Sequence, residues 1–230
     1  MSASLIRLLQ LASPTLPVGA YTYSQGLEWA VESGAVRDEA SALQWIAGCL
    51  QFGVARFEAV YLAHMLRAWQ ADDVERLSEL DAEFIASRET AELRVETLQM
   101  GHSLARLLAD LDCPRPQAGG ANGHLGLNGF EAPSFPLAWS CAAATWQINV
   151  EEAVAAYLWA WAENQVMAAV KAVPLGQTAG QRLLLALGAR LPELAGEAAD
   201  AAIATTHNYL PAFAIASSRH ETQYTRLFRS

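Results

Sequence analysis

The sequence has 230 residues, a formal net charge of −9 at pH 7 and 53 % hydrophobic residues, and only 17 % of its residues are charged. An acidic chain with a single lysine, Lys171, is poorly suited to bind nucleic acid, and no glycine-rich phosphate-binding loop precedes that lysine. Three widely spaced cysteines favour reduced thiols, and no secretory signal or long uncharged apolar run is evident, so we expect a cytoplasmic protein without a membrane span.

Helical periodicity recurs along the whole chain, and no stretch alternates as a strand would. A helix of about two turns is expected within residues 17–34. Capping residues or breakers delimit further expected helices at about 4–11, 39–70, 74–84, 90–111, 136–147, 150–173, 178–190 and 192–206. The sequence therefore predicts one all-α domain spanning residues 1–230, built as a bundle of about eight to ten helices with no β-sheet.

The segment PVGAYTYSQGLEWAVESG, residues 17–34, combines glycines and aromatic side chains around Glu28. Ser24 lies in TYSQG, which lacks the first glycine of a G-x-S-x-G nucleophile elbow, so a catalytic serine is not expected. A structural loop that packs its tyrosines and a partner-binding loop both remain open, because tyrosines on loops are frequent at interfaces.

The helix expected at 90–111 carries Glu89, Glu92, Arg94 and Glu96, which we expect to form a solvated outer face. His64 lies near the apolar stripe of the long helix, where a hydrogen-bonded core histidine is the expected role. Residues 113–135 are rich in Gly, Pro and Asn and predict a loop that is mobile or ordered only in a complex.

The stretch 151–187 centres on an apolar helix, in which residues 153–162 carry no charge. Other helices are expected to surround such a helix. Lys171 follows, either as a cation that suits the helix C-terminus or as an amine kept at a buried or partner-facing surface.

The C-terminal segment, residues 212–230, alternates aromatic residues with arginines. A frayed terminus and a docking tail are both open interpretations, and the composition favours docking because such residues dominate interface hot spots.

The five histidines stand far apart, and no H-E-x-x-H or C-x-x-C motif is present, so no self-contained zinc or nickel site and no cofactor are expected. Ligands could still converge from remote segments or across a dimer. The residues alone indicate a soluble acidic helical protein without an evident active site and with partner surfaces.

Several segments together resemble the urease accessory protein F (UreF) family: LASPTLPVGAYTYSQGLEWAVESG, RETAELRVETLQMGHSLARLL, MAAVKAVPLGQTAGQRLL and IASSRHETQYTRLFRS. The last contains the most specific motif, HETQYTRLFRS, and the likeness covers most of the chain.

The resemblance implies an all-helical homodimer in the cytoplasm that acts as a nickel-insertion chaperone and is not an enzyme. Its implied partners are the UreD/UreH scaffold protein, the GTPase UreG and apo-urease, with the chain as the bridge that regulates GTP-dependent nickel delivery. It also implies that Tyr23, Glu28 and Lys171 contribute to a GTPase-facing surface. Arg226, Leu227 and Phe228 would order on binding the scaffold protein or support that surface.

Besides a GTPase-activating role through an inserted arginine, for which none of the 14 arginines stands out, two other functions remain open at this stage. One is a nickel-binding carrier that uses His or Cys across a dimer axis. The other is an enzyme whose active site forms at a dimer interface from His102, His207 or Glu163, although no spacing in the sequence requires this.

Overall fold

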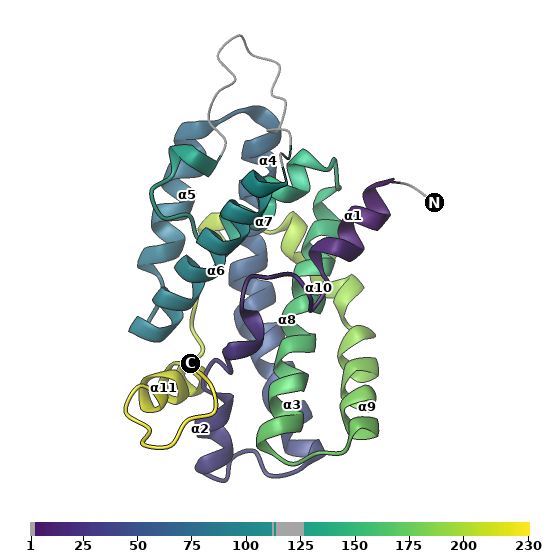
Figure 1. The fold of residues 1–230 in the computed structure, drawn as a ribbon, viewed down its shortest axis with the longest axis vertical. Coiled ribbons are helices and arrows are strands. Elements are labelled where there is room, and N and C mark those ends of the chain that lie inside the picture. The colour runs from purple at the N-terminus through teal and green to yellow at the C-terminus, as the bar shows by residue number, and fades with distance from the viewer. Residues whose placement is uncertain (1–2, 112, 114–126) are drawn as a thin grey trace.

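The computed structural model describes residues 3–111, 113 and 127–230, and every regular element in these ranges is a helix (Figure 1). The helices are α1 (Ala3–Leu11), α2 (Leu27–Glu32), α3 (Glu39–Cys49), α4 (Ala59–Ala71), α5 (Val74–Ala86), α6 (Ala91–Asp110), α7 (Phe135–Thr145), α8 (Val150–Ala172), α9 (Gln177–Gly188), α10 (Leu191–Asp200) and α11 (Pro211–His220). Short 3-10 turns are η1 (Ala20–Thr22), η3 (Leu127–Gly129) and η4 (Ile203–Thr205). The predicted all-α class is confirmed.

Side chains cap five of these helices. Asp38, Asp73, Thr90, Ser134 and Asn149 each accept a hydrogen bond from a main-chain N–H in the first turn that follows. Each cap satisfies a donor that has no partner inside the helix and stabilises it by about 1 kcal/mol. The starts of α3, α5, α6, α7 and α8 are therefore fixed by local chemistry.

Helices α3 and α4 form one continuous rod, because a nine-residue π-helical segment, η2 (Leu50–Glu58), joins them. With this rod counted once, the described part of the chain holds ten helices, which agrees with the predicted eight to ten. The rod, Glu39–Ala71, is long and apolar enough to cross a membrane by length and composition alone. However, 61 % of its most apolar window is buried inside the fold, as in the core helix of a soluble protein.

The predicted central helix is α8, which runs through the middle of the bundle (Figure 1). It packs against α1, α2, α3, α4, α9 and α10, and most of its residues between 153 and 162 are buried. An Ala-rich surface permits this because small side chains let neighbouring helices approach closely. Its C-terminal turn, which carries Lys171, lies at the end of the bundle where α2 is also found (Figure 1).

Two expectations need correction or lie outside the described residues. The helix expected at 192–206 ends at Asp200, and a 3-10 turn follows at Ile203–Thr205. Much of the loop expected at 113–135, including His124, lies outside the described residues, and the expectation for it stays untested. At its end, Leu127–Gly129 form a turn and Phe135 begins α7.

Candidate functional site

The C-terminal segment lies against the early loop at one end of the bundle. After α11 the chain turns back, and residues 221–230 pass beside α2 and the start of α6, as the yellow trace of Figure 1 shows. A frayed terminus is therefore not what the structure contains. We call residues 221–230 the tail, and the contacts below hold it in place.

Glu28 on α2 is the centre of these contacts. Its buried carboxylate accepts hydrogen bonds from the main-chain N–H of Leu227 at 2.6 Å and of Phe228 at 3.0 Å. Nε2 of the fully buried His220 lies 3.3 Å from the same carboxylate. A buried carboxylate needs such donors, because burial without partners would cost several kcal/mol.

Glu92 in the first turn of α6 makes the second set of contacts. One carboxylate oxygen bonds Nδ1 of His220 at 2.8 Å, and the other accepts from Nη1 of Arg226 at 2.8 Å. His220 thus stands between two carboxylates, one on α2 and one on α6. Glu221 completes the junction, because its carboxylate accepts from the main-chain N–H of Ala91 at 2.8 Å.

Main-chain contacts close the other end of the tail. The main-chain oxygen of Ser230 accepts hydrogen bonds from the N–H and the hydroxyl of Ser24, at 2.5 and 2.6 Å. Arg229 donates its N–H to the carbonyl of Thr22 at 2.8 Å. Ser24 is fully buried in this arrangement, so its hydroxyl holds the tail in the structure.

Glu96 corrects the expectation of a solvated outer face on α6. It is only 5 % exposed, and its carboxyl group accepts from Nε2 of Gln25 at 2.7 Å and from the Ser230 hydroxyl at 2.9 Å. The early loop and the tail cover this face of α6, which the sequence of the helix alone does not show. Burial raises the pKa of Glu96 to about 7, although the two hydrogen bonds oppose the shift.

Tyr23 and Lys171 flank the docked tail. The buried Tyr23 donates its hydroxyl to Gln99 at 2.5 Å, and its carbonyl accepts from Asn164 of α8 at 3.0 Å. Burial, together with the nearby Glu96, raises the pKa of Tyr23. Lys171 is exposed, and its Nζ lies 5.8 Å from the ring centroid of Phe228, a cation–π distance.

The structure therefore brings the six predicted site residues to one end of the molecule and divides them into two kinds. Tyr23, Glu28 and Phe228 are buried and hold the early loop and the tail together. Lys171, Arg226 and Leu227 are exposed, Leu227 by 71 %, and face solvent.

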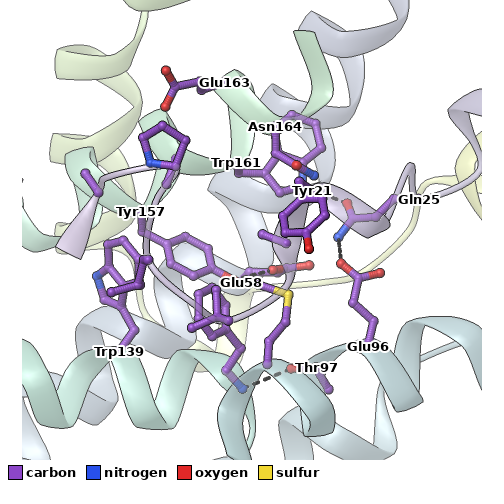
Figure 2. Close-up of a pocket in the computed structure, with 18 of the residues that line it drawn as sticks. Tyr21, Gln25, Glu58, Glu96, Thr97, Trp139, Tyr157, Trp161, Glu163 and Asn164 are labelled. Carbon is purple, nitrogen blue, oxygen red and sulfur yellow. Dashed lines mark hydrogen bonds between the residues drawn. The ribbon is translucent and has the colours of Figure 1, made fainter. Parts of the chain in front are cut away.

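A pocket of about 190 Å³ opens beside this junction, between the segment that follows α1, helix α6 and helix α8 (Figure 2). Sequence reasoning missed four of the polar residues that line it, namely Gln25, Glu58, Arg88 and Tyr157. Arg88 and Glu58 form a buried ion pair at 2.7 Å, and Tyr157 donates its hydroxyl to Glu58 at 2.7 Å. The side-chain amide of Gln25 donates a hydrogen bond to Glu96 and accepts one from the indole N–H of Trp161, each at 2.7 Å. One signal was available, because Glu58 is a lone acid on an apolar stretch of the long helix.

The structure shows no arrangement of side chains suited to a metal ion. Glu28, His220 and Glu92 are neighbours, but within residues 3–111, 113 and 127–230 no group of three or more His, Cys, Asp or Glu side chains is placed so that it could hold a metal ion. The three cysteines are free, and burial raises the pKa of Cys49 and of Cys141 to about 12. Nε2 of His64 lies 2.9 Å from the carbonyl oxygen of Ala201, as expected of a hydrogen-bonded histidine.

The histidines proposed for an interfacial active site stand apart. His102 is exposed on α6, His207 lines a separate pocket near η4, and Glu163 lines the pocket beside α8.

The fold and the site define an all-helical protein whose C-terminal tail is locked onto its N-terminal loop, with exposed cationic and apolar side chains around the junction. The sequence profile of the UreF family matches residues 36–188. The chain is 61 % identical over 226 residues to "Urease accessory protein UreF" of Azoarcus sp. (strain BH72), covering 98 % of this chain and 95 % of that protein.

Two further relatives with the same name support this assignment. The chain is 60 % identical to the protein of Dechloromonas aromatica (strain RCB), with 98 % of this chain and 97 % of the relative covered. It is 48 % identical to that of Methylobacillus flagellatus, with 100 % and 99 % covered. The chain belongs to the UreF family of urease accessory proteins.

Proposed function

We propose that this chain is a non-catalytic bridge in urease maturation, which holds a UreD/UreH-type scaffold protein and the GTPase UreG side by side on apo-urease. In this role it regulates GTP-dependent nickel delivery, acts in the cytoplasm and works as a homodimer. The relatives named above are accessory proteins by name, which supports a role in urease maturation.

The observation that carries the proposal is the contact between Lys171 and Phe228. It joins the C-terminal turn of α8 to the tail, so the residues assigned to the GTPase-facing surface and those assigned to the scaffold-facing surface adjoin. A bridge needs two binding surfaces in a fixed relationship, and the hydrogen bonds of Glu28 provide that fixity.

The surface chemistry of the junction supports protein binding. Leu227 and Tyr21 are 71 % and 65 % exposed, and Lys171 and Arg226 lie among the exposed residues of the same end. Tyrosine and arginine are enriched in interface hot spots, and exposed apolar side chains that gather on one surface mark interaction sites. Buried residues such as Glu28 and Phe228 would act indirectly, by fixing where the exposed ones stand.

The experiment that tests the proposal is reconstitution with purified partners. The full chain should co-purify with the scaffold protein and recruit the GTPase to apo-urease, and cells that lack it should fail to activate urease with nickel. Lys171→Ala should weaken GTPase recruitment and leave the fold and the dimer intact, with Lys171→Arg as the control that keeps the charge. Normal nickel-dependent activation without this chain would overturn the proposal.

A further inference from the structure

The pocket beside α8 has the dimensions of a receptor for a single side chain. Its volume of about 190 Å³ exceeds the roughly 150 Å³ of cavities known to admit a benzene molecule. A leucine, methionine or phenylalanine side chain is of that size. The pocket is therefore large enough to take one anchoring side chain.

The wall of the pocket is mainly apolar. Figure 2 shows Trp139 and Tyr157 together on one side, with ring centroids 5.3 Å apart, and Tyr21 beside Trp161 on the other. The polar groups deeper in the pocket already have partners inside the chain: Glu58 binds Arg88 and Tyr157, and Glu96 binds Gln25. Nε of Arg88 has no hydrogen-bond partner, but this atom is buried and not open to the pocket. Apart from the half-buried Glu163, an occupant would thus meet mainly rings and methyl groups, which favours an apolar group.

The mouth of the pocket carries a different chemistry. The exposed residues that line it include Tyr21, Met167, which is 42 % exposed, and Lys171. In the described part of the chain no carboxylate lies within ion-pair distance of Lys171, whose ammonium group lies near the ring of Phe228 instead. The one lysine of an acidic protein thus stands at an apolar opening without an acidic partner among these residues.

We propose that this pocket receives one apolar side chain of a partner protein, from a segment in which a neighbouring carboxylate pairs with Lys171. The inference rests on the proposed function and makes it specific, because it names the chemistry that a bound partner must present. The positive charge of Lys171 favours an acidic residue in the partner segment, and the aromatic rings around the pocket favour an apolar side chain beside it. Met167 at the mouth suits such an occupant, since its flexible side chain adapts to the shape of what it covers.

The first measurement concerns the pocket alone and needs no partner. Toluene is the probe, and the signals observed are the indole N–H of Trp161 and the main-chain N–H of residue 160 in nitrogen-15 NMR spectra. Ala160 is half-buried on α8 and lines the pocket, so Ala160→Phe should fill it. Ala155→Phe is the matched control, because Ala155 is also half-buried on α8 and does not line the pocket.

We expect toluene to shift these signals in the wild type and in Ala155→Phe, and to leave them unchanged in Ala160→Phe. A wild type that does not respond to toluene would show that the pocket does not admit apolar groups, and the inference would fall. Thermal unfolding of both variants verifies that each is folded.

The second measurement is affinity for each of the two proposed partners, the scaffold protein and the GTPase. Ala160→Phe should lower the affinity for one of them at least tenfold, while Ala155→Phe stays within twofold of the wild type. Lys171→Met should lower the affinity for the same partner several-fold, with a smaller effect at high salt, and Lys171→Arg should retain most of it.

The outcomes separate this inference from the proposed function. If the wild type binds both partners and Ala160→Phe binds them equally well, the pocket is not the receptor and the bridging role stands. If the wild type binds neither partner, the proposed bridging function is wrong. The proposal that a partner segment binds in the pocket is then wrong too, whatever the toluene result.

Discussion

Glu28 and Phe228 are 200 residues apart in sequence, and the carboxylate of the first accepts the main-chain N–H of the second at 3.0 Å. The same carboxylate binds the N–H of Leu227, so one acid on α2 fixes two consecutive residues of the tail. Because the contacts are to main-chain groups, they set the path of the tail rather than the choice of its side chains. The position of Leu227 and Arg226 at the surface thus depends on a residue that does not face solvent itself.

Replacing Glu28 should release the tail without unfolding the bundle. In Glu28→Gln the amide has one acceptor oxygen where the carboxylate has two, so at least one buried N–H of the tail loses its partner. The expected loss is about 1–3 kcal/mol, which hydrogen exchange of the Leu227 and Phe228 amides would register as faster exchange. Glu32→Gln, on the exposed side of the same helix, is the control. Unchanged protection of both amides in Glu28→Gln would contradict this account.

Gly26 should not tolerate a side chain, because α2 and α11 meet at this point. A Cβ on Gly26 would lie 2.8 Å from the main-chain nitrogen of Ser217, and the residue has a φ of 79°. Gly26→Ala therefore incurs both the penalty of the left-handed conformation, about 1–2 kcal/mol, and a backbone clash that displaces α11.

Gly19 provides the comparison that separates the two effects. It has a φ of 82°, and a Cβ added at this position would meet no atom within 4 Å, so Gly19→Ala incurs only the conformational penalty. Chemical denaturation should show a clearly larger loss of stability for Gly26→Ala. Equal losses in the two variants would mean that α11 does not pack on α2 as closely as the structure has it.

The helices could be predicted from sequence because their signals are local. Asp38, Thr90 and Asn149 cap a helix within the next three residues, so neither the rest of the chain nor its partners is needed to recognise the start. The end of α10 was missed because nothing in residues 200–206 breaks a helix as proline does. The π-helical turns at Leu50–Glu58 likewise have no sequence signal that periodicity detects.

The buried polar residues could not be predicted in the same way. Glu96 has the sequence context of a surface acid on α6, and it is buried only because segments about 70 and 134 residues away cover it. Arg88 and Glu58 likewise become a pair only when the turn between α5 and α6 packs against the long rod. The likeness to a family supplied Glu28 and Phe228 as candidates, whereas their hydrogen bond depends on a tertiary contact that no helical period encodes.

Glu96 should make stability depend on pH in a defined direction. Its pKa rises from 4.5 to about 7 on folding because the carboxyl group is buried, so between these values the folded state holds a proton that the unfolded state has released. Stability from this group is therefore fully present below about pH 4.5, falls as pH rises towards 7 and is then constant. The loss is on the order of 3 kcal/mol at most.

Glu96→Gln tests this sign, because the neutral amide cannot ionise and keeps the shape of the protonated acid. Urea denaturation at several pH values should show a smaller decline between pH 4.5 and 7 in the variant than in the wild type. Glu75→Gln, whose side chain stands in water on α5, is the control for removing an acid. Parallel curves for Glu96→Gln and the wild type would show that the folded-state pKa is not raised.

The adjacent residues Leu227 and Phe228 should respond to alanine in opposite ways. Phe228 is 7 % exposed and belongs to the hydrophobic core, so Phe228→Ala should cost up to about 3–5 kcal/mol and release the tail, detected as faster proteolysis of residues 221–230. Leu227 is 71 % exposed, and Leu227→Ala should change stability by no more than about 0.5 kcal/mol.

If the tail faces a partner, Leu227→Ala should nevertheless weaken binding of the scaffold protein by more than about 1 kcal/mol, measured by titration calorimetry. Leu185→Ala, an equally exposed leucine on α9 away from the tail, is the matched control and should bind as the wild type does. Full binding by Leu227→Ala would remove this residue from the proposed interface. A protected tail in Phe228→Ala would show that the hydrogen bonds of the tail suffice to hold it without the buried ring.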